Sequence, residues 1–263
     1  MTRTLHDFRI ETRVAVEAAQ RAGEMLREGV GRDRITVKGT RDIVTGTDTA
    51  IESEIRAVAA ARLGIPVVGE EFGGVPPEKS VYWLVDPLCG TANFAAGLPL
   101  YCTNIAVVLD GQVVAGVVVD ARGELLVSET DLGTWSVDGN GGCSPVATSP
   151  AATAVVIEAG RSTGDLRAAA ADFTAAATRA NGWDVMALNS TVSLAYVAAG
   201  RVAAYALFAP AALHLAAGSA LVAEAGGVVT DLDGAPWTLR SQSLLAAADG
   251  QTHAALLSLI AAR

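Results

Sequence analysis

"WLVDPLCGTANF", residues 83–94, is the stretch of sequence from which the fold can be inferred. Its apolar start and its turn at Asp86-Pro87 predict a buried strand that ends in a carboxylate. Gly90 and Thr91 follow, and a glycine–threonine turn that opens a helix can offer backbone N–H groups to a phosphate. The stretch therefore predicts an anion-binding loop beside an acid, with Cys89 between the two.

Two other segments of the first half carry acids at predicted strand ends or loops. "KGTRDIVTGTD" ends at Asp48, and "VVGEE" ends at Glu70 and Glu71. Acids in such places are readily hydrated and suit hard cations. Each segment alone fits a solvated loop or a helix N-cap equally well. The three segments together, in this order, are more specific for a metal and phosphate site.

Composition limits the classes of partner. The 263 residues are 51% hydrophobic, enough for a large core, and allow one large domain or two closely packed halves at roughly 150 residues per domain. The net charge of −9 without a basic block argues against nucleic acid and anionic membrane as partners. The apolar stretch 105–119 contains Asp110-Gly111, a hairpin signal, so no membrane span is expected.

The cysteines and the N-terminus indicate a compartment. Cys89, Cys102 and Cys143 are odd in number and widely spaced, which favours reduced thiols. The first 20 residues carry charges throughout and contain no apolar core of a signal peptide. We therefore expect a cytoplasmic protein.

Hydrophobic periodicity predicts a mixed α/β chain in two halves. Helices are expected near 5–27 and 44–64, and a three-stranded meander over 101–130. After a glycine-rich turn, strands alternate with apolar helices. We predict an N-terminal α+β half, 1–140, that carries the metal and phosphate motifs, and a C-terminal α/β half, 141–263, that completes the active site.

The order of the motifs resembles that of a known family. The chain contains K-x-x-x-D-x-V-T-x-x-D, then G-E-E, then W-x-x-D-P-x-x-G-T-x-N-F, and late in the sequence A-A-G-x-x-L-V-x-E-A-G-G. This arrangement, from about Lys38 to the C-terminal region, is similar to the inositol monophosphatase family of lithium-sensitive, magnesium-dependent phosphomonoesterases. The resemblance implies an α/β (α+β) fold, a layered α/β/α/β/α sandwich, and a homodimer.

The resemblance also implies roles for individual residues. The first metal would be held by Glu70, Asp86 and the carbonyl of Leu88. Asp48 and Thr91 would help to activate the attacking water. The backbone of Gly90 and Thr91 would cradle the phosphate.

Two positions depart from the family's second metal site. That site uses three carboxylates: Asp86, which is shared with the first metal, and the positions held here by Cys89 and His214. Magnesium prefers oxygen ligands in a tight octahedron and gains little from a thiol or an imidazole. We therefore expect the second magnesium ion, which stabilises the leaving oxygen in a two-metal displacement, to be missing.

The family's polyol-binding groups are also replaced. Ala203 and Leu207 stand at or near positions of family acids, and "VMALNST", 185–191, lacks the family's arginine and glycine. A buried hydroxyl without a partner costs about 1–3 kcal/mol, so a bare sugar phosphate should bind poorly. The sequence predicts instead an apolar substrate pocket for a small, largely apolar metabolite, lined by Leu207, Phe208, Pro210 and Leu213.

Three interpretations of Cys89 and His214 remain. In the first, the site has decayed and the chain is a catalytically dead binding protein. In the second, Asp86, Cys89 and His214 hold zinc, for which such ligands suit a tetrahedral site. In the third, the same three residues form a thiol–imidazole–carboxylate set for covalent or acid–base catalysis.

The third interpretation is the main prediction. It describes a repurposed enzyme of specialised metabolism that performs acyl transfer, elimination or cyclisation, with Cys89, His214, Asp86, Asp48 and Thr91 as its catalytic set. The alternative is a metal-dependent phosphomonoesterase with magnesium at the retained site or zinc at the altered one. The expected cofactor is accordingly none, or one magnesium or zinc ion.

Overall fold

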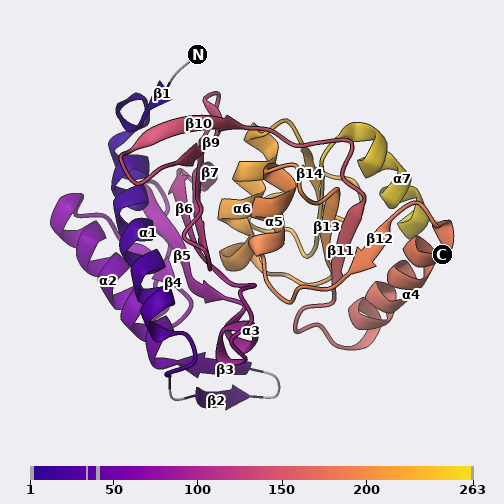
Figure 1. The fold of residues 1–263 in the computed structure, drawn as a ribbon, viewed down its shortest axis with the longest axis horizontal. Coiled ribbons are helices and arrows are strands. Elements are labelled where there is room, and N and C mark those ends of the chain that lie inside the picture. The colour runs from indigo at the N-terminus through magenta and orange to yellow at the C-terminus, as the bar shows by residue number, and fades with distance from the viewer. Residues whose placement is uncertain (1–2, 34, 40–41, 262–263) are drawn as a thin grey trace.

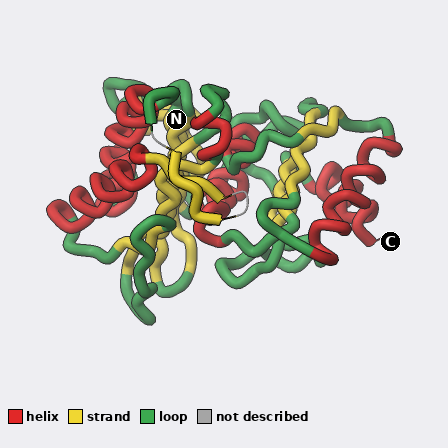
Figure 2. The backbone as a smooth tube through the Cα atoms, turned by 90° about the horizontal axis from the view of Figure 1, so that it is seen from below, coloured by secondary structure: helices red, strands yellow, loops and turns green. Residues whose placement is uncertain are grey.

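Five layers of helix and sheet make up the fold (Figure 1). The computed structural model describes residues 3–33, 35–39 and 42–261. Helices α1 (Ile10–Gly29) and α2 (Gly46–Arg62) cover one face of an eight-stranded sheet, and α5 (Val192–Ala198) and α6 (Ala212–Glu224) cover the other. A five-stranded sheet follows, with α4 (Gly164–Ala180) and α7 (Gly250–Ala261) on its outer face. The predicted mixed α/β layered sandwich is confirmed, and Figure 2 shows the outer helices at the two ends of the molecule.

The eight-stranded sheet has the order β1-β10-β9-β8-β7-β6-β5-β4. Its neighbours are antiparallel except for β4 and β5, which are parallel. The predicted meander is present as β6, β7 and β8. The strands are β1 (Arg3–Thr4), β4 (Val67–Gly69), β5 (Val81–Cys89), β6 (Cys102–Leu109), β7 (Gln112–Asp120), β8 (Leu125–Glu129), β9 (Gly133–Val137) and β10 (Gly142–Val146).

The five-stranded sheet has the order β12-β11-β13-β15-β14. Strand β11 is parallel to both of its neighbours, whereas β15 is antiparallel to both of its own. The strands are β11 (Ala154–Glu158), β12 (Asp184–Met186), β13 (Ala204–Leu207), β14 (Val228–Thr230) and β15 (Leu244–Ala247). Because β10 belongs to the first sheet, that sheet extends past residue 140, and the division at 140/141 stays a prediction.

Two short elements, a hairpin and a 3-10 turn, differ from the sequence expectation, whereas a short helix after Gly90 agrees with it. The segment read as an acid-bearing loop contains a hairpin, β2 (Ile35–Gly39) and β3 (Asp42–Thr45), in which Ile35 pairs with Thr45. The first helix begins at Ile10, after a single 3-10 turn η1 (Leu5–Asp7). A short helix α3 (Thr91–Ala95) follows β5. No helix of the described residues is long and apolar enough to cross a membrane.

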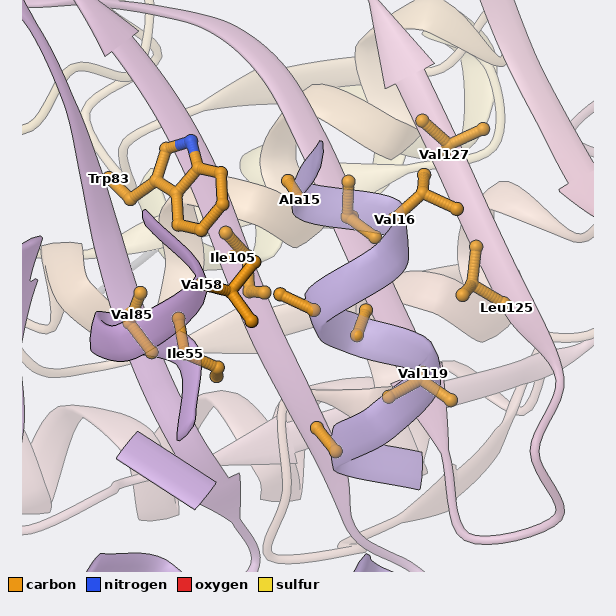
Figure 3. Packing of buried hydrophobic residues seen from close by; sticks show 14 of the residues in the cluster. Ala15, Val16, Ile55, Val58, Trp83, Val85, Ile105, Val119, Leu125 and Val127 are labelled. Atoms are coloured by element: carbon orange, nitrogen blue, oxygen red, sulfur yellow. The ribbon is translucent and has the colours of Figure 1, made fainter. Parts of the chain in front are cut away.

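Small residues let the helices lie close to the sheet. Figure 3 shows Ala15 and Val16 of α1 in one cluster of buried side chains with Val119 and Val127 of the sheet. On the opposite face, a Cβ atom at Gly116 of β7 would lie 2.2 Å from the carbonyl oxygen of Ala217 in α6. Only glycine permits this approach, so β7 and α6 are in direct backbone contact and α6 is positioned above the strands that carry the predicted site.

Candidate active site

The end of β5 carries the centre of the site. Asp86 pairs with Asn104 of β6, and the register then shifts before Cys89 pairs with Cys102. Pro87 lies in this shift, where its missing N–H does not interrupt a regular ladder. Side chains alternate along a strand, but one extra residue changes that alternation. The bulge therefore allows the side chains of Asp86 and Cys89 to face the same space.

The turn after β5 requires a glycine. Gly90 has φ of 96°, in the left-handed region, and it is the N-cap residue of α3. A Cβ atom there would lie 2.7 Å from the carbonyl oxygen of Leu100 and 3.0 Å from Ser190 Cβ. Both the backbone angle and the packing exclude a side chain, and the turn brings Thr91 back toward the beginning of α2.

Asp48 and Thr91 form the first catalytic pair predicted from the sequence. Asp48 Oδ2 accepts hydrogen bonds from the backbone N and Oγ1 of Thr45, at 2.9 and 2.6 Å, in a capping box that begins α2. Thr91 Oγ1 lies 3.3 Å from Asp48 Oδ1 and 3.0 Å from the Leu88 carbonyl oxygen. Burial raises the pKa of Asp48 to about 6, although the Thr45 hydrogen bonds lower it. Asp48 can thus accept a proton near neutral pH.

Glu70 is held by a loop that a buried glutamate organises. Glu52 accepts hydrogen bonds from the backbone N–H groups of Glu71 and Phe72, at 2.6 and 3.1 Å. It also pairs with Arg56 at 2.7 Å. Sequence reasoning did not single out Glu52. The available signal was its place on the apolar face of α2, three residues before Ile55, where an acid needs partners.

Cys89 and His214 meet at Asp86. Nδ1 of His214, from α6, lies 2.7 Å from Asp86 Oδ2, although 128 residues separate the two in sequence. Ligand atoms of Asp86, Cys89 and His214 all lie within 4.8 Å of one another. The structure therefore brings together the three side chains that the sequence placed at the altered metal position.

The protonation states of these groups follow from their surroundings. Burial lowers the pKa of His214, but the charge and hydrogen bond of Asp86 outweigh it and hold that pKa well above its usual value. Contact with Cys102, burial and the charge of Asp86 raise the pKa of the Cys89 thiol well above its usual value. Without a cation, these surroundings favour the protonated form of the His214 imidazole and the un-ionised form of the Cys89 thiol.

A polar network that sequence reasoning missed supports Cys89 and Asp86. Thr191 donates hydrogen bonds from its backbone N and its Oγ1 to Cys89 Sγ, at 3.3 and 2.9 Å. Asn104 Nδ2 donates to Thr191 Oγ1 at 3.2 Å and lies 3.5 Å from Asp86 Oδ2. No local sequence signal identified Thr191, because its partner is 102 residues away.

The predicted apolar pocket is divided between different parts of the molecule. Leu207 is 4% exposed and packs in the core between the two sheets. Phe208 is 1% exposed and packs on Phe173 of α4, on the outer side of the second sheet. Successive residues at a strand face opposite sides, so these two side chains do not line one surface. Pro210 is exposed and Leu213 is half-buried.

Known proteins resemble this chain along most of its length. The inositol-1-monophosphatase ImpA of Mycolicibacterium smegmatis is 35% identical over 255 residues, covering 94% of this chain and 90% of that protein. The inositol-1-monophosphatase of Mesorhizobium japonicum is 35% identical over 243 residues, covering 89% and 90%. The structure of the extragenic suppressor protein SuhB from Bartonella henselae has a TM-score of 0.82 and 26% identity, covering 94% of this chain and 96% of that one.

These relatives overturn the main functional prediction. The hypothesis of a repurposed Cys/His enzyme of specialised metabolism is wrong, because the similar proteins are inositol monophosphatases rather than acyl-transfer, elimination or cyclisation enzymes. The site agrees with this correction. A cysteine nucleophile acts as the thiolate, whereas contact with Cys102 and burial raise the pKa of the Cys89 thiol well above its usual value. The expectation that the protein is an enzyme is confirmed by the same relatives.

The family resemblance of the motifs is confirmed over most of the chain. The sequence model described as the inositol monophosphatase family matches residues 9–263. Its match includes Asp48, Glu70, Asp86 and Thr91 together with the later helices. The chain therefore belongs to the inositol monophosphatase family.

Proposed function

We propose that this protein is a metal-dependent phosphomonoesterase, the alternative that the sequence offered. One observation carries the proposal: Asp48 and Thr91 are hydrogen-bonded to each other beside the acids Glu70 and Asp86, and among the described residues one oxygen of Asp86 has no hydrogen-bond partner. A proton acceptor for water and a set of oxygen ligands for a cation are thus present in one place.

The acids fit a cation. Asp86 is fully buried, and within the described part of the chain its Oδ1 has no hydrogen-bond partner. Burial and the neighbouring charge of Asp86 raise the pKa of Glu70 above its usual range. Two carboxylates that disfavour each other's charge are stabilised when a cation lies between them. Glu70, Asp86 and the Leu88 carbonyl are the groups that would hold it.

A bound divalent cation would supply charge stabilisation to a phosphoryl oxygen. The chain's own residues supply the rest. Asp48 accepts the proton of the attacking water, and Thr91 Oγ1, which lies between Asp48 and the Leu88 carbonyl, orients that water. The backbone amides at the Gly90–Thr91 turn contact the phosphate of the substrate.

The relatives suggest the first substrate to test. Two of them are inositol-1-monophosphatases by name, so we propose a small phosphate monoester such as inositol 1-phosphate. Phosphate release would be measured from inositol 1-phosphate and p-nitrophenyl phosphate, with magnesium, manganese or zinc and after chelation. Asp48→Asn is the matched control, since it keeps the size of the side chain and removes the base.

Turnover that needs a divalent cation and falls in Asp48→Asn is the expected result. A protein that releases no phosphate from either ester, whichever of the three cations is present, would contradict the proposal.

A further inference from the structure

We propose that Asp86, Cys89 and His214 together bind one zinc ion, in place of a second magnesium ion. Their mixed oxygen, sulfur and nitrogen donors suit zinc better than magnesium. The catalytic meaning of this site rests on the proposed phosphatase function. The binding of the cation does not, and it can be measured without any substrate.

The donor types select the cation. Magnesium keeps an octahedron of hard oxygen ligands and dehydrates reluctantly. Thiolate and imidazole ligands suit zinc and similar ions, which accept four ligands in a tetrahedron. A carboxylate and a thiolate carry two negative charges and a neutral imidazole carries none, so the ionised set balances one divalent cation. The proton that leaves Cys89 and the proton that leaves His214 would be released to solvent on binding.

The geometry is close to that of such a site. Bond lengths of about 2.0–2.3 Å place the ligand atoms of a tetrahedral zinc ion about 3.3–3.8 Å apart. The three ligand atoms lie within 4.8 Å of one another, and His214 Nδ1 lies 2.7 Å from Asp86 Oδ2. Small side-chain movements would reach the required spacing. Three protein ligands leave the fourth position open, as in catalytic rather than structural zinc sites.

A second observation concerns the buried carboxylate of Asp86, which the two proposed cation sites would share. Oδ1 of Asp86 is buried and lacks a hydrogen-bond partner among the described residues. An orphaned carboxylate oxygen in the interior is costly, and a cation would remove that cost. The other oxygen, Oδ2, contacts His214 Nδ1 and so directs the carboxylate toward the proposed cation.

The surrounding contacts orient the sulfur as a ligand. Two hydrogen bonds from Thr191 end on Cys89 Sγ, and Asn104 links Thr191 to Asp86. Groups of this kind orient metal ligands in many proteins, and their loss typically lowers metal affinity about 10–100-fold. A cysteine that served only as a small apolar residue would need no such donors.

The test uses the full chain, freed of metal by a chelator and kept in a non-thiol reductant. Calorimetric titration with zinc and with magnesium gives stoichiometry and affinity. Titration with cobalt(II) adds a spectroscopic signature, because a cobalt–thiolate bond produces a charge-transfer band in the near ultraviolet. We expect one equivalent of zinc to bind, more tightly than magnesium, and the cobalt band to appear with it.

Three variants identify the ligands. Cys89→Ser should abolish the cobalt band and weaken zinc binding. Thr191→Val should keep the band and weaken zinc binding by about 10–100-fold. Cys143→Ser is the matched control, since that half-buried thiol lies in β10 and should leave both readouts unchanged.

The inference is overturned if Cys89→Ser retains both the cobalt band and the wild-type zinc affinity. Its failure is distinguishable from failure of the phosphatase proposal. Magnesium-dependent turnover without zinc binding would overturn only the inference, whereas zinc binding without any phosphate release would overturn only the proposed function.

Discussion

The two sides of the active site differ in their donor atoms. The first, which we call the oxygen side, offers only oxygen atoms, from Asp48, Glu70, Thr91 and the Leu88 carbonyl. The second, the mixed side, adds sulfur from Cys89 and nitrogen from His214. Asp86 belongs to both sides. The oxygen side is built from α2, the loop after β4 and the end of β5. The mixed side is completed by α6, from the other half of the chain. Because separate elements hold the two sides, each can have its own ligand chemistry.

The largest effect is expected where the two sides meet. Asp86→Asn would remove a charge from both cation sites and lower phosphatase turnover by about 10⁴-fold, since a bound cation supplies several kcal/mol of transition-state stabilisation. It would also remove the carboxylate that lies 2.7 Å from His214 Nδ1, so the free energy of unfolding should fall by about 1–3 kcal/mol. Turnover, zinc calorimetry and urea unfolding check these effects.

Asp165→Asn is the control, because it removes an exposed carboxylate outside the site. Normal turnover in Asp86→Asn would refute the proposal that Asp86 belongs to both cation sites.

The oxygen side alone is tested by Asp48→Asn. Turnover should fall by about 10³-fold, the usual contribution of a general base. Zinc affinity at the mixed side should stay unchanged, since Asp48 does not belong to that cluster. Equal losses in turnover and in zinc affinity would show that the two sides act as one unit.

The same variant should change the dependence of stability on pH. Burial raises the pKa of Asp48 from 3.8 to about 6, so the folded protein binds this proton more tightly than the unfolded chain. The associated stability is present below pH 3.8 and is lost as the pH rises through 6. In cation-free buffer, raising the pH from 4 to 7.5 should therefore lower the stability of the wild type by about 3 kcal/mol relative to Asp48→Asn, which cannot lose this proton. Asparagine also loses acceptors for the Thr45 and Thr91 hydrogen bonds, which adds a cost that does not depend on pH. Urea unfolding at both pH values measures the change, and a difference between the two proteins that is independent of pH would contradict the prediction.

The mixed side alone is tested by the double variant Cys89→Asp/His214→Asp. Three carboxylates would then face the space in which the family places its second magnesium ion. We expect the affinity for magnesium to rise and the affinity for zinc to fall. The loss for zinc should be about 100-fold or more, because even the loss of a contact that only orients a ligand can lower metal affinity by that factor. Calorimetry with both ions measures the change. Zinc binding as tight as in the wild type would show that the three side chains are not its ligands.

The smallest effect is expected at the turn that joins the two sides. Gly90→Ala should lower the free energy of unfolding by about 2 kcal/mol or more, because it combines a left-handed φ with a Cβ atom 2.7 Å from the Leu100 carbonyl oxygen. Gly97→Ala is the matched control, since φ is 71° there but nothing lies within 4 Å of the added atom. Similar losses in the two variants would show that backbone conformation alone, and not packing, requires Gly90.

Local pattern was sufficient for the elements and for the oxygen side. Strand β5, the β6–β8 meander and helix α2 follow from apolar periodicity and turn residues. Asp48, Glu70 and Asp86 were found because acids stand at the ends of these elements. Glu52 and Thr191 were missed, since their importance lies in contacts 19 and 102 residues away. The apolar pocket was misjudged at Phe208, whose neighbour Leu207 faces the other side of the sheet.

The sequence by itself determined the family, the order of the layers and the chemical types of the ligands. The family resemblance implied that His214 reaches Asp86, and the structure gives the contact between them. Only the tertiary structure decided that Thr191 donates to the sulfur of Cys89 and that, among the described residues, one oxygen of Asp86 has no hydrogen-bond partner. Periodicity assigns a buried face to each helix but does not say which strand that face will cover. For α6, the close approach of Ala217 to Gly116 fixes its position over β7. This position places the imidazole of His214, which belongs to α6, at the end of β5.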